Sequence, residues 1–424
     1  RRWMIQVERK TAKAEPKPIT GQSRRDLLLD EAARQLNAKG ISQTALLDVA
    51  TALGLSRAAV YYYADDRQDL VFQCYRRSCE ALARDLAVAS QGPGASLDRI
   101  EAFITRSLDP DRVEEAVLSE VAYLSEDQQA TIDALVEGLL AQLRDLIDTG
   151  QQCGEIRSCD SAIIAHALFG MVSWIPLAPR WLGEDAGLRA RSTSAAIDLL
   201  RNGMAARPSS ITDLPRIDVT EIRPPRGSIF SREQAAAMKT EELLRAASRL
   251  FNRKGIDATS LDEIGAAVGA TKGVVYHYLS DKPDLIARCY RRAFALGERV
   301  LKAMENFQGN GLARATAGFR LLVEMNARAE FSPLAPLAGV DALQPAARKE
   351  VVSLARRSEQ AFPAAVEAGI ADGTIRPVDL VGTAVALAGT FGWIPKWFDG
   401  EDEAMVERIA DEFQQLYAFG LTAK

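Results

Sequence analysis

Apolar residues recur at helical spacing along almost the whole chain. Leu29, Ala32, Ala33 and Leu36 fall at i, i+3, i+4 and i+7, and Gly40 follows them as a stop signal. The alternation of apolar and polar residues that is typical of half-buried strands is nearly absent. The pattern therefore predicts an all-α protein.

The same stripe returns 215 residues further along the chain. Residues 24–77 align without a gap on residues 239–292, and 22 of the 54 aligned pairs are identical. Solenoid repeats usually have periods of about 20–50 residues, so a repeat of this length indicates a duplicated domain.

The duplication extends beyond this stretch. Amphipathic segments at 97–204 and 312–421 follow the two copies, and Gly154-Glu155-Ile156-Arg157 corresponds to Gly373-Thr374-Ile375-Arg376. Between the halves, residues 204–232 are rich in proline and lack helical periodicity. We expect an extended linker there, able to span about 100 Å.

Each copy contains the residue pattern of a helix-turn-helix (HTH). This motif needs a small residue where its helices touch, a glycine that turns the chain at positive φ, and an apolar anchor under the second helix. These positions are held by Ala50, Gly54 and Val60 in the first copy and by Gly265, Gly269 and Val275 in the second. Ser56 and Thr271 fit as N-caps of the second helices.

The second helix of each motif presents basic and aromatic residues. It reads Arg57-Ala58-Ala59-Val60-Tyr61-Tyr62-Tyr63 in one copy and Lys272-Gly273-Val274-Val275-Tyr276-His277-Tyr278 in the other. Four residues of these helices fit the apolar core of their domain, namely Val60, Tyr63, Val275 and Tyr278. The remaining side chains are left for the outer face. Such a helix fits the major groove of DNA, with its early residues near the base edges.

Both copies resemble the tetracycline-repressor (TetR) family of one-component bacterial regulators. The resemblance is carried by the run Thr271-Lys272-Gly273-Val274-Val275-Tyr276-His277-Tyr278-Leu279-Ser280-Asp281-Lys282-Pro283-Asp284-Leu285, which is close to the family signature. The family implies a three-helix DNA-binding domain followed by a helical bundle that holds a small ligand and forms a dimer interface. We therefore expect HTH domains at 23–85 and 239–300, ligand-binding and dimerisation bundles at 86–203 and 301–424, and a proline-rich linker at 204–238. The six lysines and arginines among the first twenty residues predict a basic disordered arm at 1–22.

The resemblance also implies the residues that contact DNA. Carried over by position, they are Thr44, Ser56, Arg57, Ala58, Tyr61, Tyr62 and Arg67 in the first copy, and Thr259, Thr271, Lys272, Gly273, Tyr276, His277 and Lys282 in the second. Thr44 and Thr259 would open a helix and offer a hydroxyl and backbone amides to phosphate. Tyr61 and Tyr276 suit phosphate or a thymine methyl, Arg67 and Lys282 suit phosphate, and Arg57 and Lys272 suit guanine or phosphate.

The first copy departs from the family pattern in two places. Ala64 stands where Leu279 supplies a bulky apolar residue, and Asp65 adds an acid close to the expected path of phosphate. We expect weaker and less salt-dependent DNA binding by this copy. If one or both motifs have lost DNA binding, the chain is instead a ligand-binding helical scaffold.

Two copies in one chain predict an intramolecular pseudo-dimer. A two-fold symmetric DNA-binding dimer places its recognition helices about 34–36 Å apart. The linker is long enough to allow this separation within one chain. Because the two recognition helices differ in sequence, we expect an imperfect palindrome as the preferred DNA site. A homodimer of chains with four HTH domains is the alternative.

Composition narrows the functional classes. The chain is 47% apolar and 26% charged, has no apolar run of 18 residues and lacks the apolar core of a signal peptide at its start, so we expect a cytoplasmic protein without a membrane span. Two histidines, five cysteines without metal-ligand spacing and no nucleophile or phosphate-loop motif predict no enzyme, cofactor or metal. The net charge of −5 matters less than the charge of the docking face.

The bundles suggest a ligand of low polarity. Tryptophans flank Pro176 and Pro395, and a similar connector occurs in family members that sense coenzyme-A thioesters, so the resemblance implies a small lipophilic effector, acyl-coenzyme A or aromatic, that releases a repressor from DNA. The expected pocket residues are Phe103, Tyr123, His166, Trp174, Phe319, Met325, Phe391 and Trp393. Plain core packing is the alternative role for each of them.

Overall fold

The computed structural model describes residues 23–183, 187–207, 214–224, 231–278, 281–335 and 343–423. Within these ranges the regular structure is helical, with two isolated β-bridges and no longer strand. The all-α prediction is confirmed. The expected basic arm at 1–22 lies outside the described residues, as do Leu279 and Ser280 of the family signature.

The first unit contains nine α-helices within the described residues. They are α1 (Arg24–Lys39), α2 (Leu46–Ala52), α3 (Arg57–Tyr63), α4 (Arg67–Ser90), α5 (Ser96–Ser107), α6 (Glu126–Gln152), α7 (Ser161–Trp174), α8 (Ala178–Leu182) and α9 (Leu188–Asn202), with a short 3-10 turn, η1 (Val121–Tyr123), before α6.

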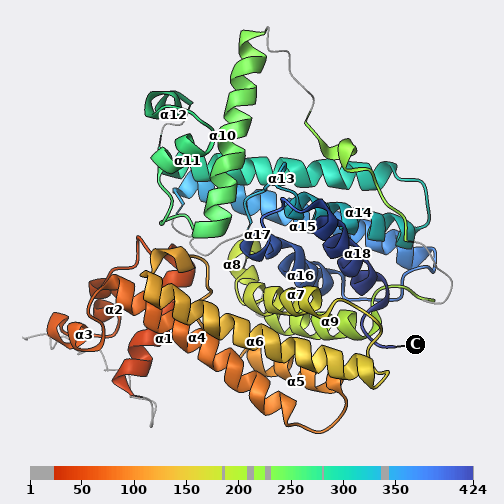
Figure 1. The fold of residues 1–424 in the computed structure, drawn as a ribbon, viewed down its shortest axis with the longest axis horizontal. Helices are drawn as coiled ribbons and strands as arrows, with labels where there is room; N and C mark the ends of the chain where they lie inside the picture. The colour runs from red at the N-terminus through yellow and green to blue at the C-terminus, as the bar shows by residue number, and fades with distance from the viewer. Residues whose placement is uncertain are drawn as a thin grey trace, which may run out of the picture.

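The second unit repeats this order. It comprises α10 (Arg232–Lys254), α11 (Leu261–Ala267), α12 (Lys272–Tyr278), α13 (Lys282–Asn306), α14 (Gly311–Ala327), α15 (Pro345–Ala371), α16 (Leu380–Gly392), α17 (Ile394–Trp397) and α18 (Glu403–Phe419). Helices α1–α3 and α10–α12 form the first and second HTH domains. In each unit one long helix, α4 or α13, runs from the HTH domain into the bundle (Figure 1).

The two bundles share one hydrophobic core. Buried residues of α5, α6, α7 and α9 form a single cluster with buried residues of α14, α15, α16 and α18. Each HTH domain has a smaller core of its own. The pairing of the bundles therefore removes apolar surface of both units from water, and this burial favours the intramolecular pseudo-dimer.

Helices α7 and α16 cross where glycine faces glycine. A Cβ atom on Gly170 would lie 2.4 Å from the carbonyl oxygen of Gly389, and a Cβ on Gly389 would lie 2.9 Å from the Cα of Met171. Gly382 allows a similarly close approach of α16 to α9, since its Cβ would lie 2.8 Å from the carbonyl oxygen of Arg191. In α7 the corresponding residue is Ile163, and α18 packs less extensively on α7 than α9 does on α16. The pseudo-symmetry is therefore imperfect.

Each unit donates a hydrogen bond to the end of the other unit, and we call this reciprocal pair of contacts the clasp. Arg157 of the first unit donates from Nε to the carbonyl of Gly420 over 2.8 Å, and Arg376 of the second donates from Nε to the carbonyl of Gly203 over 2.7 Å. Single β-bridges, Ile156 to Thr422 and Ala205 to Ile375, lie beside these contacts. The two repeated Gly-X-Ile-Arg sequences thus hold the halves together.

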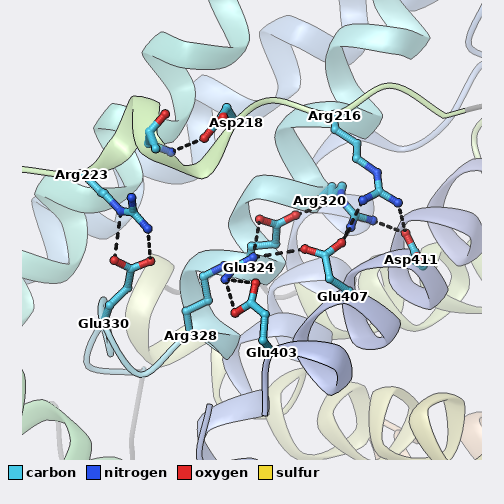
Figure 2. A network of polar contacts seen from close by, with 11 residues as sticks. Arg216, Asp218, Arg223, Arg320, Glu324, Arg328, Glu330, Glu403, Glu407 and Asp411 are labelled. Carbon is cyan, nitrogen blue, oxygen red and sulfur yellow. Dashed lines mark hydrogen bonds and ion pairs between the residues drawn. The ribbon is translucent and has the colours of Figure 1, made fainter. Parts of the chain in front are cut away.

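The described part of the linker lies against the second bundle as a strap, residues 214–224. Ile217 and Ile222 are buried in an apolar cluster with α13 and α14. Arg216 pairs with Glu407 and Asp411, and Arg223 pairs with Glu330 (Figure 2). Apolar and charged contacts therefore hold these linker residues against the second bundle. In addition, α10 begins at Arg232, seven residues before the expected domain boundary at 239.

Candidate nucleic-acid interface

The turns of both HTH motifs have the predicted geometry. Gly54 and Gly269 have φ of +66° and +65°, a conformation that L side chains rarely adopt. The residue after each glycine donates a hydrogen bond of 2.9 Å from its amide to the carbonyl oxygen of the small residue in the first helix. These bonds run from Leu55 to Ala50 and from Ala270 to Gly265. Val60 and Val275, the predicted anchors, are fully buried.

The recognition helix α3 presents its predicted contact residues to solvent. Ser56 caps it by accepting a hydrogen bond from the amide of Ala59. Arg57, Ala58, Tyr61 and Tyr62 are exposed, and 82% of the surface of Tyr62 is accessible. The Arg57 guanidinium lies 5.6 Å from the centre of the Tyr61 ring, within cation–π distance.

The recognition helix α12 has a similar outer face. Thr271, Gly273, Tyr276 and His277 are exposed, and 49% of the surface of Tyr276 is accessible. The carbonyl of Thr271 accepts from the amides of the first helical turn, as expected of an N-cap residue. The side chain of Lys272 lies outside the described part of the structure.

Thr44 and Thr259 do not have the predicted position. Both are buried. Each hydroxyl donates a hydrogen bond of 2.8 Å to the carbonyl oxygen of the glycine four residues earlier, Gly40 or Gly255. Helix α11 is capped by Ser260 instead, and α2 begins at Leu46. The threonine hydroxyls are satisfied inside each domain and are not available to phosphate.

Arg67 and Lys282 are the first residues of α4 and α13. Both are partly buried, and each follows an aspartate N-cap, Asp66 or Asp281. Burial raises the pKa of Tyr123 in η1, and the positive charge of Arg67 opposes the rise.

Both recognition helices lie at the same side of the molecule, away from the paired bundles (Figure 1). Neither is buried against protein, since each exposes several side chains of its outer face. A duplex could therefore approach α3 and α12 from one direction.

The two HTH domains meet at a polar junction formed by Ser42, Asp257, Glu120, Ser119 and Lys396. The amide of Ser42 donates to the carboxylate of Asp257, and the amide of Asp257 donates 2.7 Å to the carboxylate of Glu120. Lys396 of α17 donates 2.6 Å to the carbonyl of Ser119. The junction joins both HTH domains to the connector of the second unit, and sequence gave no signal for it.

Burial shifts the pKa values of two groups of this junction, Glu120 and Lys396, toward the neutral form. It raises the pKa of Glu120 to about 7, with the charge of Asp257 adding to the rise and Lys396 opposing it. Burial also lowers the pKa of Lys396 to about 8.

We expect the junction to weaken as pH rises. Because folding raises the pKa of Glu120 from its ordinary 4.5 to about 7, the stability from this group is full below the ordinary value and is lost as pH rises through about 7. The free energy of unfolding in urea should fall by about 1 kcal/mol between pH 6 and pH 8 through this group alone. Glu120→Gln should remove that part of the pH dependence, whereas Glu221→Gln, at an exposed carboxylate, should not. An unchanged pH profile in Glu120→Gln would contradict the assignment.

A cavity of about 190 Å³ lies in the second bundle, between α13, α14, α15 and α16. Four of the eight expected pocket residues line it, namely Trp174, Phe319, Met325 and Phe391. Trp174, Trp181 and Leu182 reach it from the first unit, so both halves build its wall.

The other four expected pocket residues lie elsewhere. Phe103 is buried in the shared core, and Tyr123 packs on the core of the first HTH domain. His166 stacks on Trp397 at 4.1 Å between ring centres, and Trp393 packs edge-on against Phe169. These four residues do not line the cavity of the second bundle, and their place in a ligand pocket stays a prediction.

Other chemistry is limited in the described residues. They contain no group of three or more histidine, cysteine, aspartate or glutamate side chains placed to hold a metal ion. Their five cysteines are unpaired, and burial raises the pKa of Cys74 and Cys289 to about 12, as expected of inert thiols. Among the helices described, none is both long enough and apolar enough to cross a bilayer.

Models of known families match the chain twice. One described as "Bacterial regulatory proteins, tetR family" matches residues 28–74 and 243–289. One described as "Tetracyclin repressor-like, C-terminal domain" matches residues 96–204 and 317–421. Together the matches cover both HTH domains and most of both bundles.

Individual relatives are similar over shorter stretches. The HTH-type transcriptional regulator AcrR of Shigella flexneri is 34% identical over 82 residues, which are 19% of this chain and 38% of that protein. The transposon Tn10 TetC protein of Escherichia coli is 38% identical over 52 residues, 12% of this chain and 26% of that protein. The chain thus spans less than half the length of these relatives.

A solved structure of AibR in complex with isovaleryl coenzyme A and operator DNA is 23% identical to the chain. It is similar over 36% of this chain and 86% of that one, with a TM-score of 0.33.

Proposed function

The chain belongs to the tetR family of bacterial regulatory proteins, and on this premise we propose that it is a sequence-specific DNA-binding transcriptional regulator. One observation carries the proposal: a single shared core holds two exposed recognition helices on the same side of one chain. This is the arrangement that a two-fold symmetric DNA-binding dimer achieves with two chains.

The preferred DNA site is an imperfect palindrome. Arg57-Ala58-Ala59 opens α3, whereas Lys272-Gly273-Val274 opens α12, so the base edges facing the two helices meet different side chains. Arg57 and Lys272 approach guanine or a neighbouring phosphate, while Tyr61, Tyr62, Tyr276 and His277 contact phosphate or thymine methyl groups. Ser56, Ala58, Thr271 and Gly273 let the helix N-termini come close to the duplex, and Arg67 and Lys282 contact its backbone.

The effector acts through the long helices that join bundle and HTH domain. Helix α13 lines the cavity with Tyr290 and also contributes to the core of the second HTH domain. A ligand bound about 100-fold better by a form with displaced HTH domains shifts the equilibrium by about 2.7 kcal/mol. Such a shift would release a repressor from its operator, with a small lipophilic molecule as the effector.

DNA binding is tested with tyrosine variants of the full chain. Tyr61→Ala and Tyr276→Ala should each weaken binding to the DNA upstream of the coding region by about tenfold, because each removes a hydrogen bond to a charged group, and the double variant should lose about 100-fold. Val88→Ala, an exposed apolar residue in the bundle part of α4, is the matched control and should bind normally. Gel shift gives the affinities, and footprinting gives the protected length.

The outcomes separate the alternatives. Loss confined to Tyr276→Ala would mean that only the second HTH domain binds DNA, and no binding by the unaltered chain would favour a ligand-binding scaffold. Light scattering of the free protein should give the mass of one chain, 46.2 kDa. Twice that mass would mean a homodimer of chains.

A further inference from the structure

A second hollow, of about 390 Å³, lies outside the bundle core, between α10, α13 and the strap. Four arginines of α13 line it, namely Arg288, Arg291, Arg292 and Arg299. Glu241 of α10 is the one carboxylate among the described residues of its wall, and Leu244, Leu296 and Pro224 add apolar surface. The volume is in the range of about 300–1,000 Å³ that is usual for small-molecule sites. We call this hollow the arginine groove.

The arginine groove follows one face of α13. Positions 288, 291, 292, 295 and 299 are spaced at i, i+3, i+4, i+7 and i+11, so they form a row about 16 Å long. At one end Arg288 donates a hydrogen bond of 2.6 Å to the carbonyl oxygen of Tyr278, the last residue of α12. At the other end Arg299 donates one of 3.3 Å to the carbonyl oxygen of Ile222 in the strap. In Figure 1 the strap lies on the other side of α10 from α12, so the groove runs away from the recognition helix.

The two arginines in the middle of the row are held by carboxylates. Arg291 pairs with Glu350 at 2.7 Å, and Arg292 pairs with Glu241 at the same distance. The Arg291 side chain remains 43% exposed, and a guanidinium has five N–H donors, of which one carboxylate uses at most two. These pairs orient the arginines without using all of their donors.

The arginines at the two ends keep more free donors. Arg288 lies 3.8 Å from the nearest oxygen of Asp284, and Arg299 has no carboxylate within ion-pair distance in the described part of the chain. The Nε and Nη2 atoms of both arginines donate to no described group, and none of them is sealed from solvent. An anion that enters the groove can therefore pair with them.

The first unit carries an acid at the corresponding place. The offset of 215 residues puts Glu80 of α4 at the position of Ala295, and Glu80 pairs with Arg76 at 3.5 Å. The same offset puts the uncharged Gln73 at the position of Arg288. The second unit thus has one more positive charge and one fewer negative charge along this face, which favours an anion there.

We propose that the arginine groove binds one small phosphate-bearing molecule per chain, with its phosphates on the arginines of α13 and a less polar part on Leu244 and Leu296. A guanidinium matches phosphate through two parallel hydrogen bonds, and such charge-assisted bonds are about twice as strong as neutral ones. The inference goes beyond the proposed function, because this site is separate from the bundle cavity and takes an anionic rather than a lipophilic ligand.

Three probes test the chemistry on the full chain without DNA. Calorimetry is done with ADP, inorganic phosphate and adenosine, in the presence of EDTA so that no divalent cation masks the phosphate charge. ADP should bind at one molecule per chain, about tenfold more tightly than inorganic phosphate, because its two phosphates reach more than one arginine. Adenosine should not bind, and added salt should weaken the binding of ADP. No binding of ADP, or equal binding of ADP and adenosine, would overturn the proposal.

Substitutions at the exposed Ala295 test the position. Ala295→Glu gives the second unit the carboxylate that the first unit has at Glu80. It should lower the affinity for ADP by about tenfold or more, because a carboxylate one turn from Arg291 and Arg299 pairs with them and repels phosphate. Ala295→Gln has the same shape without the charge and should bind ADP as the unaltered chain does. Equal losses in the two variants would overturn the assignment to the arginines.

A matched arginine pair separates the second unit from the first. Arg299→Gln should weaken ADP binding by about tenfold, whereas Arg84→Gln, at the equivalent position of the first unit, should not. Equal effects of the two variants would contradict a site in the second unit.

Gel shift on the same samples distinguishes a small ligand from the DNA backbone. Because the groove runs away from α12, Arg299→Gln and Ala295→Glu should bind DNA as the unaltered chain does. Weaker DNA binding by both variants, with no ADP bound by the unaltered chain, would mean that these arginines contact DNA phosphates and would overturn the proposal. A chain that binds one ADP but no DNA would support the groove and contradict the proposed function.

Discussion

Replacing Gly170 by valine should separate the two bundles. A Cβ atom at this position would lie 2.4 Å from the backbone oxygen of Gly389 and 2.8 Å from the Cβ of Trp393, closer than real contacts allow. Because the nearest obstacle is backbone, α7 and α16 must move apart along their whole crossing and expose part of the shared core. We expect a loss of about 3 kcal/mol or more in the free energy of unfolding, together with the loss of high-affinity DNA binding.

Gly138→Val is the matched control. Gly138 lies on the exposed face of α6, where a Cβ meets nothing within 4 Å, so this variant should differ from the unaltered chain by less than about 1 kcal/mol. Urea unfolding gives the free energies, and gel shift gives the affinity for DNA. A Gly170→Val chain as stable as the Gly138→Val chain would show that the helices do not cross as described.

Replacing Arg320 by leucine should cost about 3–5 kcal/mol of stability. The Arg320 side chain is almost completely buried and pairs with three carboxylates, Glu324 at 2.9 Å, Glu407 at 2.6 Å and Asp411 at 2.5 Å (Figure 2). Leucine removes the central positive charge and leaves the acids repelling one another in a partly buried place. Arg216 of the strap shares Glu407 and Asp411, so the strap should loosen as well.

The control for this variant is in the same network. Arg223 also pairs with a carboxylate, that of Glu330 at 3.0 Å, but both side chains are well exposed. Arg223→Leu should therefore cost less than about 1 kcal/mol. Urea unfolding measures both variants, and limited proteolysis of residues 214–224 reports the strap. Similar costs for the two variants would mean that burial does not decide the strength of these pairs.

Local features of the HTH domains could be predicted from sequence because they depend on near neighbours. The turn glycine Gly54, the N-cap Ser56 and the buried anchor Val60 need only the preceding and following residues to define them. Thr44 marks the limit of this reasoning. Its side chain could face solvent or turn back to the carbonyl of Gly40, and only the packed domain decides between the two.

The cavity could be predicted only in part. Phe319 and Met325 lie on α14 of the unit that contains it, but Trp181 comes from the other unit and lies more than 100 residues away from Tyr290 in sequence. His166 and Val385 are equivalent by alignment, yet one is stacked and the other lines open space. Such differences depend on how the halves pack, and no pattern within one half records them.

The reciprocal clasp of Arg157 and Arg376 has a consequence for how the chain sits on a promoter. The first unit is bound to the second unit of the same chain, so one first and one second HTH domain always face DNA together. A dimer of identical subunits can lie on its operator in either of two equivalent ways. The two units of this chain differ from each other. On an asymmetric operator the chain should therefore bind in one orientation, with the same unit always next to the neighbouring gene.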